Sequence, residues 1–95
     1  MSLIIADNSK DQIFALNPEL IPVPVIASFN KRGDMIPLYF SYEGLRLKVD
    51  NIKWKDSQMI LQEKFCCEVT LMDRVQEVIL HYHRKYDIWT MERLR

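Results

Sequence analysis

Hydrophobic and polar residues alternate most regularly between residues 45 and 50. Leu45, Leu47 and Val49 alternate there with charged residues. A second alternating set lies upstream and consists of Ile36, Leu38, Phe40 and Tyr42. A period of two predicts β-strands that turn one face to a core and the other to water.

Short polar segments with glycine separate these strands. Glu43-Gly44 is short enough for a tight hairpin, and residues 30–34 (NKRGD) form a polar loop after a first strand over residues 25–29. Pro37 lies within the second strand, where it cannot donate a hydrogen bond to a neighbour. We therefore expect Pro37 at a sheet edge or a bulge.

The apolar positions change parity after Val49, because Ile52 and Trp54 are the next apolar residues. A shift of one residue turns every later side chain to the other face. The sequence therefore predicts a β-bulge near Asp50-Asn51, which would bend the strand.

Three more strands are predicted near residues 59–71, 75–83 and 88–91, with turns at Asp73-Arg74 and from Arg84-Lys85. The predicted inward side chains are Phe65, Cys67, Val69, Leu71, Val78, Leu80 and Tyr82. If Met72 pairs with Val75, these residues form apolar cross-strand pairs, and Cys66 lies opposite His81 on the outer face.

The first 24 residues have a different pattern. Ser9-Lys10-Asp11-Gln12 has the form of a capping box, which predicts a short helical turn before Asn17-Pro18. Residues 18–24 (PELIPVP) are expected to be extended. They could act as a proline ligand for a partner, but packing on the domain is favoured because it would cover their apolar side chains.

These elements predict an all-β fold of five to six strands in a small antiparallel meander. The expected form is an SH3-like or half-open barrel, and a sheet packed against the N-terminal segment is the alternative. The domain would comprise residues 25–91, with residues 1–24 as a leader and residues 92–95 as a tail.

Residues 29–38 (FNKRGDMIPL) resemble a segment of small, uncharacterised proteins of Gram-positive bacteria. In that group a strand ending in Ala-Ser-Phe precedes a glycine turn and a Pro-Leu strand. A hairpin that contains Tyr and Trp closes the chain, and Tyr82 and Trp89 would occupy such a hairpin here. The resemblance would cover most of residues 24–91. It implies no catalytic or binding residues.

Composition narrows the class of protein. Of the 95 residues 48% are hydrophobic, and formal net charge is zero, so no global basic field attracts nucleic acid. The apolar runs are too short to span a bilayer, and no secretion signal is visible. Two adjacent cysteines, Cys66 and Cys67, fit a reducing compartment, so we expect a cytoplasmic protein without membrane contact.

Candidate chemistry is sparse. Cys66, His81 and His83 share the predicted outer face, but their spacing matches no zinc motif. Cys66 could act as a nucleophile with His81 as its base and Glu68 nearby. However, the flat outer face of a sheet rarely forms the concave pocket that catalysis uses. We therefore expect no metal, no cofactor and no enzymatic activity.

Two surfaces remain as candidate binding regions. Arg84 and Lys85 lie beside Tyr86 and Trp89, a combination that small barrels use for single-stranded nucleic acid. Exposed Tyr39 and Ile79 could instead contribute to an apolar patch for a partner protein, or for a homodimer through that patch or a strand edge. The favoured function is a protein-interaction or accessory module, and a weak single-strand binder is the alternative.

Overall fold

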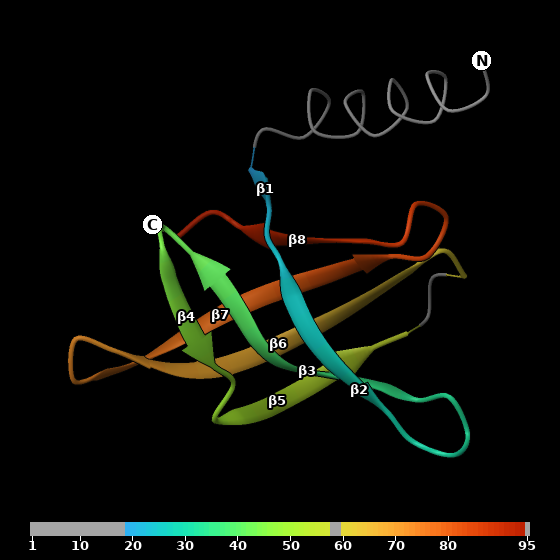
Figure 1. Ribbon diagram of the computed structural model, residues 1–95, viewed down its shortest axis with the longest axis horizontal. Coiled ribbons are helices and arrows are strands. Elements are labelled where there is room, and N and C mark those ends of the chain that lie inside the picture. The colour runs from blue at the N-terminus through green and yellow to red at the C-terminus, as the bar shows by residue number, and fades with distance from the viewer. Residues whose placement is uncertain (1–18, 58–59, 95) are drawn as a thin grey trace.

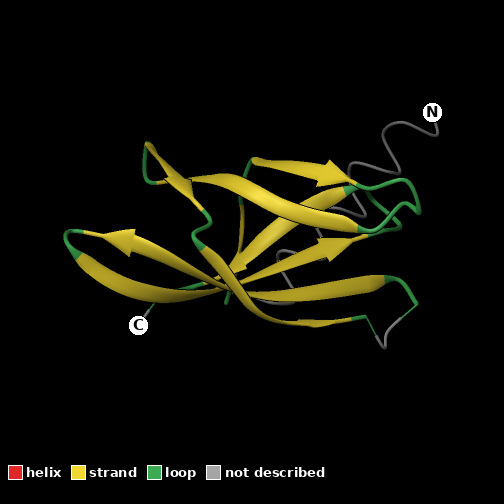
Figure 2. Cartoon of the chain, turned by 90° about the horizontal axis from the view of Figure 1, so that it is seen from below, coloured by secondary structure: helices red, strands yellow, loops and turns green. Residues whose placement is uncertain are grey.

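The computed structural model describes residues 19–57 and 60–94, which form strands and loops without a helix (Figures 1 and 2). The strands are β1 (Leu20–Pro22), β2 (Val25–Phe29), β3 (Met35–Tyr42), β4 (Leu45–Lys48), β5 (Asn51–Asp56), β6 (Gln62–Leu71), β7 (Arg74–His83) and β8 (Ile88–Glu92). The helical turn predicted from Ser9 lies outside the described residues. No helix in the described part of the chain could cross a membrane.

The strands form two antiparallel sheets, so the predicted all-β class is confirmed. One sheet has the order β1-β8-β7-β6-β5, and the other has the order β2-β3-β4. The chain passes between the sheets at two corners, residues 23–24 and residues 49–50. The residues of each corner hydrogen-bond to strands of both sheets, but the strands divide into two separate sheets, so the fold is not a closed barrel.

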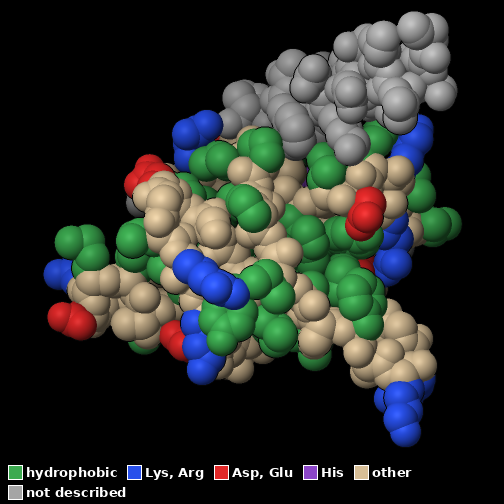
Figure 3. Space-filling model, in the orientation of Figure 1, with side chains coloured by type: hydrophobic (Ala, Val, Ile, Leu, Met, Phe, Trp, Pro, Cys, Tyr) green, Lys and Arg blue, Asp and Glu red, His purple; other side chains and the backbone are tan. Residues whose placement is uncertain are grey.

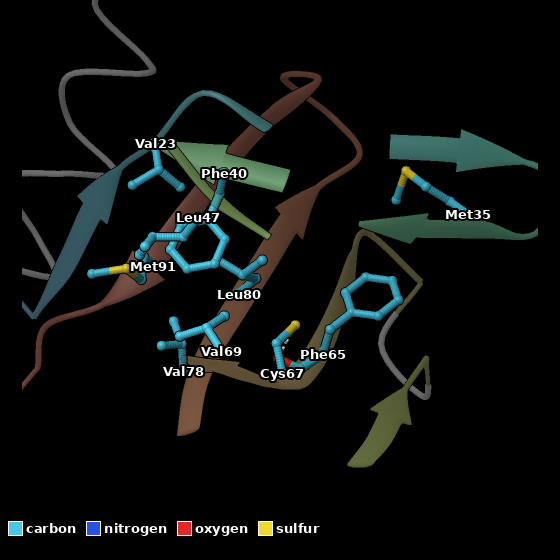
Figure 4. Packing of buried hydrophobic residues seen from close by; sticks show 10 residues of the cluster. All are labelled: Val23, Met35, Phe40, Leu47, Phe65, Cys67, Val69, Val78, Leu80 and Met91. Atoms are coloured by element: carbon cyan, nitrogen blue, oxygen red, sulfur yellow. Dashed lines mark hydrogen bonds between the residues drawn. The ribbon is translucent and has the colours of Figure 1, made fainter. Parts of the chain in front are cut away.

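The core lies between the two sheets. Phe40 and Leu47 of the smaller sheet point toward Leu80 and Met91 of the larger one (Figure 4). Of the predicted inward residues of the larger sheet, Phe65, Cys67, Val69, Val78 and Leu80 are buried. Leu71 and Tyr82 are partly buried and pack against this core. Apolar side chains from both sheets thus fill one shared interior.

Strand β3 departs from the predicted alternation. Met35, Pro37 and Phe40 are buried, whereas Ile36 and Leu38 are exposed, so the prediction that these two face inward is wrong. The β2–β3 pairing skips Leu38, which forms a bulge beside Pro37. The expected bulge at the proline is confirmed, and it lets Pro37 and Phe40 face the same side.

The parity change after Val49 has a different origin from the predicted bulge. Residues 49–50 are the corner at which the chain leaves the smaller sheet for the larger one. A register shift does occur, but it lies between Ile52 and Trp54. This shift turns Trp54 to the outer face, opposite Cys66.

The predicted pairing of β6 with β7 is wrong by two residues. Leu71 pairs with Arg74, and Cys66 lies opposite Ile79 instead of His81. Met72 and Asp73 form the two-residue turn, both with positive φ (53° and 63°). A shift of two residues preserves the face of every side chain, which explains why the inward set is still correct.

Candidate functional site

Strand β2 is an edge strand without a charged residue. Its sequence is VIASF, and β3 is the only described strand that pairs with it. Edge strands usually carry charge, proline or a bulge that prevents pairing with another chain. In Figure 1, β2 crosses in front of the other strands, and its last residue, Phe29, is 67% exposed. We call the unpaired side of β2 the open edge.

The hydrogen-bond pattern shows which backbone groups reach the open edge. The N–H of Ser41 donates to the carbonyl of Pro24 at 3.1 Å, and the N–H of Asn30 donates to the carbonyl of Asp34 at 3.0 Å. In an antiparallel ladder, the residue next to such a bond turns its own N–H and C=O away from the partner strand, and this orientation recurs at every second residue. The open edge therefore presents the backbone groups of Val25, Ala27 and Phe29.

Apolar side chains continue from β2 onto the outer face of the smaller sheet. Ile26 is 48% exposed, Ile36 is 45% exposed and Leu38 is 39% exposed. The bulge at Leu38 explains the third of these, because it adds one side chain to the outer face. In Figure 3, green hydrophobic side chains lie in several groups across the visible face, among scattered Lys and Arg.

An open apolar groove of about 610 Å³ borders the start of β2. It is lined by Pro22, Val23, Pro24, Val25, Asp87, Ile88 and Trp89. The Trp89 ring packs against Phe65 and Tyr82, with ring centroids 5.6 and 5.1 Å apart. These contacts hold the indole in one position, so the groove has a rigid aromatic wall.

A hydrogen bond orders the rim of this groove. The hydroxyl of Tyr82 donates to Oδ1 of Asp87 at 2.6 Å. This bond, followed by burial, raises the pKa of Tyr82 to about 12. Asp87 also has positive φ (54°), a conformation that Asp tolerates better than most residues.

A second, smaller groove of about 270 Å³ shares Pro24 and Val25 with the first. Its lining also includes Ile26, Tyr39 and Arg46. The Arg46 guanidinium lies 4.9 Å from the centroid of the Tyr39 ring. We use the term β2 surface for the open edge, both grooves, which include the half-buried Tyr39, and the exposed side chains of Ile26 and Leu38.

The structure divides the predicted binding residues among three places. Trp89 and Tyr39 each line one groove of the β2 surface. Ile79 lies on the outer face of the larger sheet, opposite Cys66. Arg84, Lys85 and Tyr86 lie in the turn between β7 and β8, where Lys85 sits 5.5 Å from the Tyr86 ring.

Arg84 has a structural partner. Its Nη2 lies 2.9 Å from Oε1 of Glu63, a residue that is only 4% exposed. Lys55 Nζ lies 3.3 Å from the same oxygen, and the Ser57 hydroxyl donates to it at 3.0 Å. Arg84 thus neutralises a buried carboxylate, which would have to lose this partner if Arg84 bound phosphate.

The two histidines lie within a polar network on the outer face of the larger sheet. Gln62 Nε2 donates to Nδ1 of His81 at 2.6 Å, and Nε2 of His81 lies 2.7 Å from a carboxylate oxygen of Glu92. Since an amide nitrogen can only donate, Nδ1 accepts, and a neutral imidazole can donate to Glu92 through Nε2. His83 bonds Thr90 Oγ1 at 2.9 Å.

Burial lowers the pKa of both imidazoles. For His81 burial outweighs the opposing effect of Glu92, and for His83 the neighbouring His81 lowers the pKa further. Both rings therefore favour the neutral form in the fold. The network explains how polar side chains are accommodated in this part of the sheet.

Cys66, His81 and His83 do not converge as a metal set. Cys66 Sγ lies 3.7 Å from a carboxylate oxygen of Glu77, and no group of three or more ligand side chains is found among residues 19–57 and 60–94. Burial and Glu77 raise the pKa of Cys66, and burial raises the pKa of Cys67 to about 12. Raised thiol pKa values oppose the thiolate form that a nucleophile requires.

Sequence reasoning named a strand edge as a possible interface but did not identify β2 as that edge, and it overlooked Arg46 and the proline-lined groove. The run of five uncharged residues in VIASF was a visible signal for the edge. The grooves carried no comparable signal, because they join residues from two or three separate segments.

Comparisons with known proteins add no family: no family model matches the chain, and no curated protein or solved structure matches it either. The resemblance of residues 29–38 to proteins of Gram-positive bacteria therefore stays a prediction.

Proposed function

We propose that this protein is a non-enzymatic interaction module that binds an extended segment of a partner protein through the β2 surface. The observation that carries the proposal is the open edge of β2, which has no charge and begins beside two grooves. An extended segment that joins a sheet edge gains backbone hydrogen bonds, and adjacent pockets then select its side chains.

The SH3-like interpretation of the fold belongs to this proposal. A small meander of strands that bends at two corners and exposes aromatic grooves is suited to holding extended segments. Trp89 and Tyr39 would supply the aromatic walls, and the prolines at residues 22 and 24 would supply rigid apolar contacts.

Binding of single-stranded nucleic acid is the less favoured function. Net charge is zero, and Arg84 is engaged with the buried Glu63. A phosphate-binding surface needs cations that are free to release counterions.

Site-specific photo-crosslinking in the native host tests the proposal. A photoreactive benzoylphenylalanine in place of Tyr39 should crosslink to another polypeptide chain, either a second copy or a different protein, because Tyr39 lines a groove of the β2 surface. The matched control replaces Val75, which is 70% exposed but lies at the start of β7. Equal crosslinking from both positions, or crosslinking to nucleic acid alone, would contradict the proposal.

A further inference from the structure

We propose that the partner of the open edge is a second copy of this chain, paired antiparallel through β2 with a two-fold axis at Ala27. This inference rests on the proposed function and specifies its partner. The two smaller sheets would then join into one continuous sheet through β2 and the partner's β2.

The backbone of the open edge is self-complementary. Its three residues, Val25, Ala27 and Phe29, are arranged symmetrically about Ala27. In the antiparallel pair, Ala27 faces Ala27 of the partner subunit, and Val25 faces Phe29 of the partner subunit. Each of the three residues can then donate one hydrogen bond and accept another.

The length of the strand matches this pairing. The chain bends away toward β1 at Pro24, and it enters the loop to β3 at Asn30. Pairing therefore begins and ends with the residues of β2, and no backbone group of the edge is left over.

Side chains also fit. Phe29 is 67% exposed although its position in the strand turns it to the inner side of the sheet. In the pair, its ring would lie beside a valine of the partner, which is an apolar cross-strand contact. The exposed Ile26 would lie beside a serine, so no charged group meets another across the axis.

The other edge strands lack these properties. β1 has three residues and ends with a proline, and β4 and β5 both carry charges. The register shift in β5 further disrupts its edge. Proline, charge and bulged residues are the usual devices that prevent edge pairing, and the five residues of β2 include none of them, because the extra residue of the β2–β3 register shift, Leu38, lies in β3.

Analytical ultracentrifugation of the pure protein from micromolar to millimolar concentration should show a monomer–dimer equilibrium. Ser28→Lys should weaken the dimer roughly tenfold or more, because it places two like charges near the axis. The control is Ile36→Lys, which adds the same charge directly opposite Ser28 but one strand away from the open edge. Circular dichroism should show that both variants are folded.

Cysteine crosslinking tests the register. Directly paired residues of this type have Cα atoms about 5.5 Å apart, within the range of a disulfide. Ala27→Cys should therefore form an intermolecular disulfide, whereas the Ser28→Cys pair would be diagonal neighbours about 7–8 Å apart and should not. The native Cys66 and Cys67 are buried and should not interfere.

A monomer at every concentration would overturn the inference, as would a dimer that Ile36→Lys disrupts and Ser28→Lys does not. A dimer without the Ala27→Cys disulfide would also overturn it. The proposed function fails separately, because it depends on crosslinks from position 39 in the host. A monomeric protein with such crosslinks to another protein would retain the proposed function and refute only the self-pairing.

Discussion

Leu45 and Leu47 show that the burial of a side chain depends on its place in the sheet. Both belong to the same alternating set, yet Leu47 is 8% exposed and Leu45 is 52% exposed. Leu45 pairs with Tyr42 directly after the turn at Glu43-Gly44, at the end of the smaller sheet. Leu47 pairs with Phe40, which is in the core, so only the second leucine is covered by both sheets.

Leu47→Ala should lower the free energy of unfolding by about 2–5 kcal/mol, because it removes buried methyl groups and leaves a cavity. Leu45→Ala should change this free energy by less than about 1 kcal/mol, since the side chain already contacts water. Urea denaturation of both variants measures the difference. Equal losses would show that the two leucines share one environment.

In strand β3, one unpaired residue determines which side chains of the whole strand face the core. Pro37 and Phe40 both face inward, and Leu38 is the residue that the pairing skips. Without Leu38 the remaining residues of β3 would alternate regularly, with Ile36 and Tyr39 outward. The bulge thus lets β3 pair regularly with β2 on both sides of Leu38, although its inward residues do not alternate strictly in the sequence.

Deletion of Leu38 should therefore preserve the fold, because every other side chain of β3 keeps its face. The matched control is deletion of Ile79, an outward residue in the regular strand β7. That deletion makes Val78 and Leu80 neighbours, so one of these two core residues must face outward. Circular dichroism and thermal unfolding should show a cooperative transition for the first variant and none for the second.

At the scale of the whole molecule, the two corners convert a meander into two packed sheets. Residues 23–24 and 49–50 each take the chain from one sheet to the other. The larger sheet is further joined by side chains, since the network of His81 links β6 to β8 through Gln62 and Glu92. Protonation of the histidines therefore affects the stability of the sheet as a whole.

Stability should decrease as pH falls below about 6.5, the ordinary pKa of histidine. The folded pKa values of His81 and His83 are lowered, so the unfolded chain binds more protons in this range, and acid favours unfolding. Urea unfolding between about pH 7.5 and 5.5 measures the slope. The double variant His81→Gln, His83→Gln should flatten it, and an unchanged slope would exclude the histidines as its cause.

Local patterns were enough to determine the strands and their faces in most of this chain. Alternation identified the inward residues of β6 and β7, since the face of a side chain depends only on its parity within the strand. Glycine and proline likewise marked the turn at Gly44 and the irregularity at Pro37, because their backbone preferences are local.

Tertiary structure alone decided the register, the corners and the binding surface. A two-residue turn at Met72-Asp73 requires positive φ at both residues, and no composition rule points to methionine there. The corner at residues 49–50 resembles a bulge in sequence, because both change parity. The β2 surface joins segments from residue 22 to residue 89, and only packing of the two sheets brings such distant segments together.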